Sequence, residues 1–211
     1  MSSVQIFHRD EKRNETLVSV VDGDLIKAHS GTIRVKILNS PPDIIYRFTL
    51  YGPSAAAFKH VIEEIKSIDS NRVLFIPIHN AGLLEAIDIH QAVSFLQIEP
   101  MQSHIEGHIR GYLSHNLVTP EQLQLLQRTY GAALEGSAGH KIMSVMVATL
   151  AYDDVHEHMS DDVKAALQRA CAPYPKLTEA INHKVHVLRM IKMNKERTAK
   201  KRAAREAAAA E

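Results

Sequence analysis

Apolar and polar residues alternate in the first third of the chain, and this alternation predicts short β-strands. Residues Leu17–Val21 are apolar or β-branched apart from Ser19, and the apolar pattern resumes over Leu25–His29. Between them lies Asp22-Gly23-Asp24, and Asp-Gly between two such runs is a strong signal for a tight hairpin turn. We therefore predict a β-hairpin over residues 17–29.

Other parts of this region have weaker signals. Ile44–Tyr51 alternates again and predicts a strand, whereas 33–38 fits either a strand or a short helix. The apolar run 73–78 contains Pro77, which suits an edge strand because proline donates no hydrogen bond. Residues 1–16 are rich in charged and polar residues, so we expect a flexible N-terminus there.

From Ser54 onward the period changes from two residues to that of an α-helix. Ala57, Phe58, Val61, Ile62 and Ile65 fall on one helical face, with Ser54 as the N-cap. Similar patterns predict helices over 83–95, 101–113 and 142–152, and further helices that begin near Thr119, Ser160 and Leu177. The clearest local signal is Thr119-Pro120-Glu121-Gln122, which predicts a capping box with proline at the first helical position.

This order of elements predicts an α+β protein. A small sheet built from residues 17–78 packs against a multi-helix half, and a helical extension follows toward the C-terminus.

Three short stretches resemble the BTB/POZ domain in its divergent fungal form. Val18–His29 is similar to the family's opening hairpin, which leads into an Ala-His pair such as Ala28-His29. Ile44–Leu50 followed by Pro53–Phe58 resembles the next strand and a Phe-bearing helix. Phe95–Pro100 resembles the junction at which one helix ends and another follows at once. The resemblance covers roughly residues 17–115.

The resemblance implies a non-catalytic module that binds proteins as an adaptor or scaffold in a larger complex. It divides the chain into a flexible segment 1–16, a BTB/POZ-like domain 17–118, a packed helical extension 119–193 and a basic tail 194–211. The stretch GTIRVKILNSPPD after His29 departs from the family, which has two helices and a Ser-x-x-Phe turn here. We expect little room for two helices in it, and hence a truncated domain.

Composition agrees with an ordinary globular protein. Of 211 residues, 45% are hydrophobic and 23% are charged, and the single cysteine, Cys171, excludes an internal disulfide. No apolar run approaches the roughly 20 residues needed to span a bilayer, and the N-terminus has no apolar signal-peptide core. We expect an intracellular protein, nuclear or cytoplasmic, that does not enter membranes.

The charge is unevenly distributed along the chain. Residues 184–211 carry nine basic and three acidic residues, a net charge of +6, whereas residues 1–183 carry 16 basic and 21 acidic residues, a net charge of −5. The candidate partner-binding residues are the cations toward the end of this stretch: Lys192, Lys195, Arg197, Lys200, Lys201, Arg202 and Arg205. Besides a protein partner, a second copy of the chain included, this tail suits nucleic acid, which it would contact through the backbone.

Sites for catalysis are weakly indicated, and we expect neither an enzyme nor a cofactor. His104 and His108 share a helical face, which can hold zinc, but the Glu that a metalloprotease needs after the first His is absent. A metal-dependent hydrolase at this pair is the least favoured function. His156-Glu157-His158 fits an exposed loop better than a metal site, and we expect Cys171 to be a buried structural residue.

Overall fold

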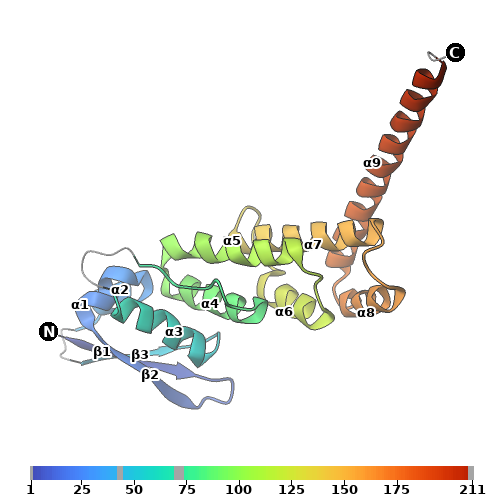
Figure 1. The fold of residues 1–211 in the computed structure, drawn as a ribbon. Coiled ribbons are helices and arrows are strands. Elements are labelled where there is room, and N and C mark those ends of the chain that lie inside the picture. The colour runs from blue at the N-terminus through green and yellow to red at the C-terminus, as the bar shows by residue number, and fades with distance from the viewer. Residues whose placement is uncertain (1, 42–44, 69–73, 209–211) are drawn as a thin grey trace. The chain divides into compact units, whose positions relative to one another are not determined.

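The computed structural model describes residues 2–41, 45–68 and 74–208. Over these residues the chain is an α+β protein with a three-stranded sheet and nine helices (Figure 1). Its internal contacts divide the chain into two compact units, Met1–Ile109 and Arg110–Glu211. The predicted fold class is confirmed at this level, and the division falls inside a helix rather than between residues 118 and 119.

The sheet of the first unit consists of β1 (Ser3–Arg9), β2 (Glu15–Asp22) and β3 (Ile45–Leu50) in the order β2-β1-β3. β1 runs antiparallel to β2 and parallel to β3. The prediction of a flexible N-terminus over 1–16 is therefore wrong, because β1 is the central strand. Its inward residues, Val4, Ile6 and His8, alternate with partly exposed residues that are polar except for Phe7, so the average composition of the segment gave no sign of the strand.

The predicted hairpin over 17–29 is also wrong, since its second half is helical. Asp22 is the N-cap of α1 (Gly23–His29), and its carboxylate accepts hydrogen bonds from the backbone N–H groups of Asp24 and Leu25, both at 2.9 Å. Asp is favoured in turns and at helix N-caps for the same reason, a short side chain that accepts from nearby amides. The real hairpin joins β1 to β2, one element earlier.

A second short helix, α2 (Gly31–Leu38), follows α1 after Ser30. It decides the open choice at 33–38 in favour of a helix. It also corrects the expectation that this stretch had little room for two helices, because α1 and α2 need only 16 residues between Gly23 and Leu38.

The helix α3 (Ala55–Lys66) begins where the sequence predicted, with Ser54 accepting a hydrogen bond from the Ala57 N–H at 3.2 Å. Both α3 and α1 pack on one face of the sheet, and α4 packs on α2 and α3 (Figure 1). The fully buried Phe58 and Ile6 lie in this core, and the Ser19 hydroxyl on β2 donates to Glu63 on α3 at 3.0 Å.

The predicted edge strand over 73–78 is not present in its described part, residues 74–78, which form neither strand nor helix. Leu74, Ile76 and Ile78 are nevertheless buried while Phe75 is 57% exposed. The alternation thus matches the burial of the side chains. An extended segment becomes a strand, however, only when its backbone forms hydrogen bonds with a neighbouring strand.

The predicted helix pair is confirmed as α4 (Leu83–Leu96) and α5 (Glu99–His115). Gln97 separates them in the left-handed conformation, with φ at 54°. One such residue ends α4 and lets the chain enter α5 within two residues.

The second unit is helical. After the end of α5 it consists of α6 (Pro120–Tyr130), α7 (Ala138–Val155), α8 (Asp161–Cys171) and α9 (Pro175–Ala208). The capping box at Thr119 and Gln122 is confirmed in both directions, at 3.3 and 3.0 Å. Along the described residues, no helix combines the length and apolar character that crossing a membrane requires.

Candidate partner-binding surface

Two helix junctions in the first unit pack directly on each other. The hydroxyl of Ser30, between α1 and α2, donates to the carbonyl of Leu96 at the end of α4 at 2.9 Å, and the side chain of Ser30 is fully buried. Thr32 donates to the carbonyl of Phe95 at 2.5 Å. A Cβ on Gly31 would lie 2.8 Å from the Gln97 side chain, so the junctions are in close contact.

The sheet face opposite α1 and α3 carries exposed apolar side chains. Leu17, Val20 and Ile45 are each about half exposed on the outer side of β2 and β3. Beside them Glu15 forms ion pairs with Arg9 and Arg47, and the Arg47 guanidinium lies 4.1 Å from the centre of the Phe7 ring. Hydrogen bonds to both arginines hold the pKa of the Glu15 carboxyl below its usual range, so its charge persists in mild acid.

In the second unit, α9 has a packed half and an exposed half. The packed half begins at the buried Leu177 and lies along α7. Two contacts mark where packing ends: Arg189 pairs with Asp154 of α7 at 3.0 Å, and the Lys192 ammonium donates to the carbonyl of Val155 at 3.3 Å. Every described side chain from Arg189 to Glu206 is exposed.

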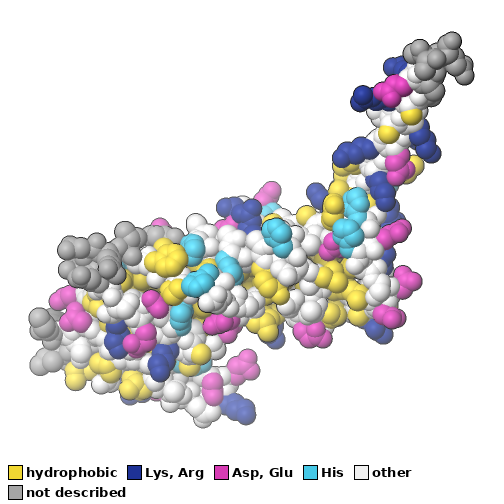
Figure 2. Space-filling view, viewed as in Figure 1, with side chains coloured by type: hydrophobic (Ala, Val, Ile, Leu, Met, Phe, Trp, Pro, Cys, Tyr) yellow, Lys and Arg dark blue, Asp and Glu magenta, His cyan; other side chains and the backbone are white. Residues whose placement is uncertain are grey.

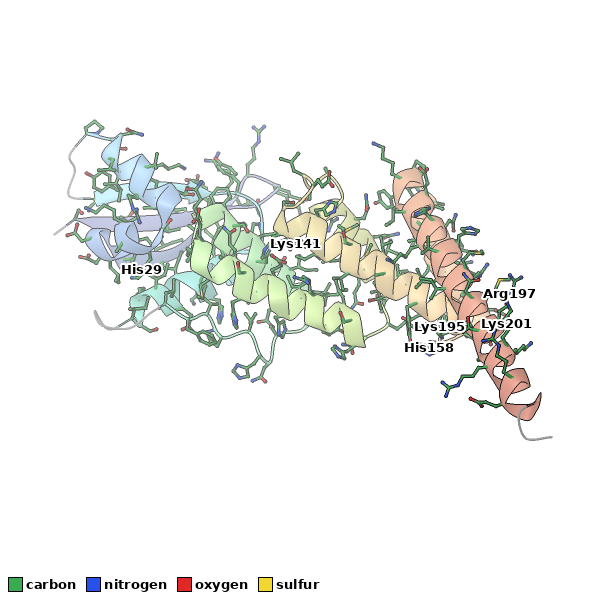
Figure 3. The ribbon with its side chains drawn as sticks, turned by 90° about the horizontal axis from the view of Figure 1, so that it is seen from above. His29, Lys141, His158, Lys195, Arg197 and Lys201 are labelled. Atoms are coloured by element: carbon green, nitrogen blue, oxygen red, sulfur yellow. The ribbon has the colours of Figure 1, made fainter. Side chains whose placement is uncertain are left out.

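The exposed half of α9 carries the cations that the sequence singled out. Figure 2 shows Lys and Arg side chains along this helix, and Figure 3 places Lys195, Arg197 and Lys201 on its C-terminal half. These residues therefore share one helix that extends beyond the packed half of α9. The full set lies within four helical turns: Lys192, Lys195, Arg197, Lys200, Lys201, Arg202 and Arg205.

Apolar residues adjoin these cations where α9 leaves its packing. Met190, Ile191 and Met193 are 44–46% exposed. Exposed apolar side chains next to a basic segment give a helix surface that can bury area in a partner and attract it by charge.

The two histidines weighed as a metal site, His104 and His108, contact other groups in the structure. His104 lies against the ring of Phe75, with ring centres 4.9 Å apart, and Nε2 of His108 is 3.2 Å from the Ala81 carbonyl oxygen. Across the described residues, no group of three or more His, Cys, Asp or Glu side chains is arranged to hold a metal ion.

The second histidine cluster closes the end of α7. His156 is the C-cap residue and its ring centre lies 4.2 Å from that of Tyr152, while Nδ1 of His158 is 3.1 Å from an Asp153 carboxylate oxygen. The geometry shows aromatic contacts and a hydrogen bond, which stabilise a helix end.

Cys171 is buried, as predicted, and burial raises the pKa of its thiol. It lines a cavity of about 490 Å³ between α7, α8 and α9, together with Leu150, Met159, Leu167 and Val185. A thiol with a raised pKa in apolar surroundings is a poor nucleophile.

Sequence reasoning missed two features of this surface. The open sheet face depends on β1, whose alternation over Ser3–Arg9 was the available signal. The contact between the junctions could not be read from the sequence, because residues 30 and 96 are far apart along the chain.

Comparison with known proteins gives no relative: the chain matches no family model, no curated protein and no solved structure.

Proposed function

We propose that this chain is a non-catalytic protein-interaction module of BTB/POZ-like type that works as an adaptor or scaffold subunit of a larger complex. The observation that carries the proposal is the contact between the two helix junctions. Ala28-His29, which here ends the helix α1 and not a hairpin, and Phe95–Pro100 are stretches on which the family resemblance rests, and Ser30 next to the first bonds to Leu96 in the second.

The helix α2, which follows Ala28-His29 at the end of α1, adds support. In the family, helices that follow the Ala-His pair form much of the homodimer surface, and α2 exposes Val35 at 55% and Leu38 at 73%. A second copy of the chain is accordingly one of the partners that the proposal includes.

Besides the exposed residues of α2, the interaction surfaces of the module are the open sheet face and the apolar residues of α9. Both present several half-exposed apolar side chains beside charged ones, an arrangement suited to a partner's apolar anchor residues.

Affinity purification of the tagged full-length chain from nuclease-treated native extract tests this function. Three polar variants separate the surfaces: Val35→Gln with Leu38→Gln on α2, Leu17→Thr with Val20→Thr on the sheet face, and Met190→Gln with Met193→Gln on α9. The matched control is Leu134→Gln, because Leu134 is 82% exposed and lies outside these surfaces. Mass spectrometry identifies the proteins recovered, and light scattering gives the mass of the purified chain.

We expect a defined protein to be recovered by the wild type and the control and lost from at least one surface variant. A homodimer would appear as a doubled mass that falls to the monomer mass in the α2 variant. The proposal is wrong if all variants recover the same proteins at the same level as an unrelated bait and the chain is a monomer throughout.

A further inference from the structure

The exposed half of α9 carries a large net positive charge. Residues 189–208 contain eight basic and two acidic residues, a net charge of +6 over about 30 Å of helix. Arg189 is ion-paired to Asp154, and Arg202 to Glu206 at 2.8 Å, but both arginines and Glu206 are largely exposed, so these pairs are weak and exchangeable. The segment is a stiff cationic rod that begins where packing on α7 ends.

The cations cover most of the circumference of the rod. At 3.6 residues per turn, Arg197 and Lys200 lie on one side, and Lys195 and Arg202 lie on the opposite side. Lys201 and Arg205 fall between these two pairs. The remaining side carries Glu196 and Glu206 beside Lys192, so the net positive charge covers two opposite flanks and the side between them, which limits the kinds of partner that the segment fits.

A helix that lies on an anionic membrane needs an apolar face opposite its basic face. After Met193 the segment contains Ala as its only apolar residue type, so that face is missing. An acidic patch on a folded protein approaches a helix from one side, and the cations on the far side would then stay in water. Positive charge on two opposite flanks instead suits a site with negative charge on both sides.

The major groove of B-form DNA is such a site. Its width of about 12 Å accepts a helix of about 10–12 Å diameter, and phosphates line both edges. In this pose Lys201 and Arg205, which lie between the two flanking pairs, face the groove, and Glu196 and Glu206 on the opposite side of the helix face away from the DNA. The deep, narrow major groove of duplex RNA does not admit a helix.

We propose that the exposed half of α9 binds duplex DNA by lying in its major groove, held by phosphate contacts on both sides and without sequence preference. This activity lies beyond the protein-interaction role and does not depend on it. The exposed half of α9 contains no Phe, Tyr, Trp or His, which argues against stacking on the bases of a single strand.

Fluorescence anisotropy with a labelled mixed-sequence DNA duplex of about 20 base pairs tests the proposal on the full-length protein over a range of salt concentrations. Two double variants remove opposite sides of the rod: Arg197→Gln with Lys200→Gln, and Lys195→Gln with Arg202→Gln. The control, Arg128→Gln with Lys141→Gln, removes two exposed cations of the same unit that lie on α6 and α7. Far-ultraviolet circular dichroism checks that every variant keeps its helix content.

We expect each α9 double variant to weaken binding at least about tenfold at 0.1 M salt and to lower the slope of log K against log salt by about 2, while the control binds like the wild type. Equal losses from the two opposite sides are the mark of a groove.

Loss of affinity in only one of the two α9 variants would mean that one side of the helix contacts the DNA, which is not binding in a groove, and would overturn the proposal. Stronger binding to polyglutamate than to DNA would mean an acidic protein partner and would overturn it too. So would equal affinity for duplex RNA, binding to phosphatidylserine vesicles instead of DNA, or no binding to the duplex at low salt.

Discussion

At the scale of single residues, two buried polar side chains matter most in the first unit. Ser30 is fully buried and makes two hydrogen bonds: its hydroxyl donates to Leu96 and accepts from the Ile33 N–H at 3.2 Å. It is thus both the N-cap of α2 and the link to α4. A buried hydroxyl with both bonds satisfied fixes the register of the two junctions.

Ser30→Ala should lower the free energy of unfolding by about 1–3 kcal/mol, because it leaves a buried carbonyl unsatisfied and removes a helix cap. Urea denaturation measures the loss. The control is Ser40→Ala, whose hydroxyl bonds to the Lys36 carbonyl near the exposed end of α2 and should change stability by less than about 0.5 kcal/mol. Equal effects at the two positions would contradict the role assigned to Ser30.

His90 on α4 is the second of these two buried polar side chains, with 4% exposure. Burial lowers the pKa of its imidazole below the usual 6.5, and the negative charge of Glu106 on α5 opposes this in part. The folded protein therefore holds His90 neutral at a pH where the unfolded chain protonates it.

Stability should fall as the pH drops below about 6.5, since the unfolded chain then binds a proton at His90 that the folded chain does not. The slope that this residue contributes is at most about 1.4 kcal/mol per pH unit. Urea midpoints of wild type and His90→Leu across this range isolate the contribution, because the other histidines are common to both proteins. Parallel curves for the two proteins would rule out a lowered pKa at His90.

At the scale of elements, glycine in a helix serves different purposes in α5 and α7. Gly139 lies at the start of α7, where a Cβ would be 2.8 Å from the Ala133 Cβ and 3.0 Å from the Tyr130 ring. Gly107 in α5 would place a Cβ where no atom of the described residues comes within 4 Å. The close packing of α7 on the end of α6 thus depends on one hydrogen atom in place of a methyl group.

The same substitution should have opposite signs at these two positions. Gly139→Ala should destabilise by about 1–3 kcal/mol through overpacking, and Gly107→Ala should stabilise by about 0.5–1 kcal/mol through helix propensity. Thermal unfolding of both variants is the measurement. Stabilisation by Gly139→Ala would show that α6 and α7 do not pack as described.

At the scale of the whole molecule, contacts gather in two units that meet within α5, between Ile109 and Arg110. Each unit has its own core, with Ile6 and Phe58 in the first and Leu126 and Met146 in the second, all fully buried. Separate cores favour separate units of local unfolding.

Leu126→Ala should cost about 2–5 kcal/mol by opening a cavity in the core of the second unit. In native-state hydrogen exchange we expect faster exchange over 110–208 and unchanged exchange in β1, β2 and α3. Leu134→Ala, at an 82% exposed position of the same unit, should leave both patterns unchanged. A uniform acceleration over both units would mean that they unfold as one.

What could be predicted from the sequence depended on how far apart along the chain the interacting residues lie. Caps at Ser54 and Thr119 and the helical periods after them could be predicted from the sequence, because the partners lie three residues apart. The basic end of α9 was readable for the same reason, since charge and helix propensity are local.

Pairing and packing were decided by the tertiary structure. β1 became the central strand because it pairs with both β2 and the distant β3, and 74–78 stayed outside the sheet although its burial alternates. Asp22 could begin a turn or a helix, and α1 packing on the sheet and on α3 determined which. Long-range contacts carry the energy that chooses among locally equivalent conformations. The sequence by itself therefore determined the capped helix starts at Ser54 and Thr119, and only the folded chain determined which strands pair, that Asp22 begins a helix, and that Ser30 meets Leu96.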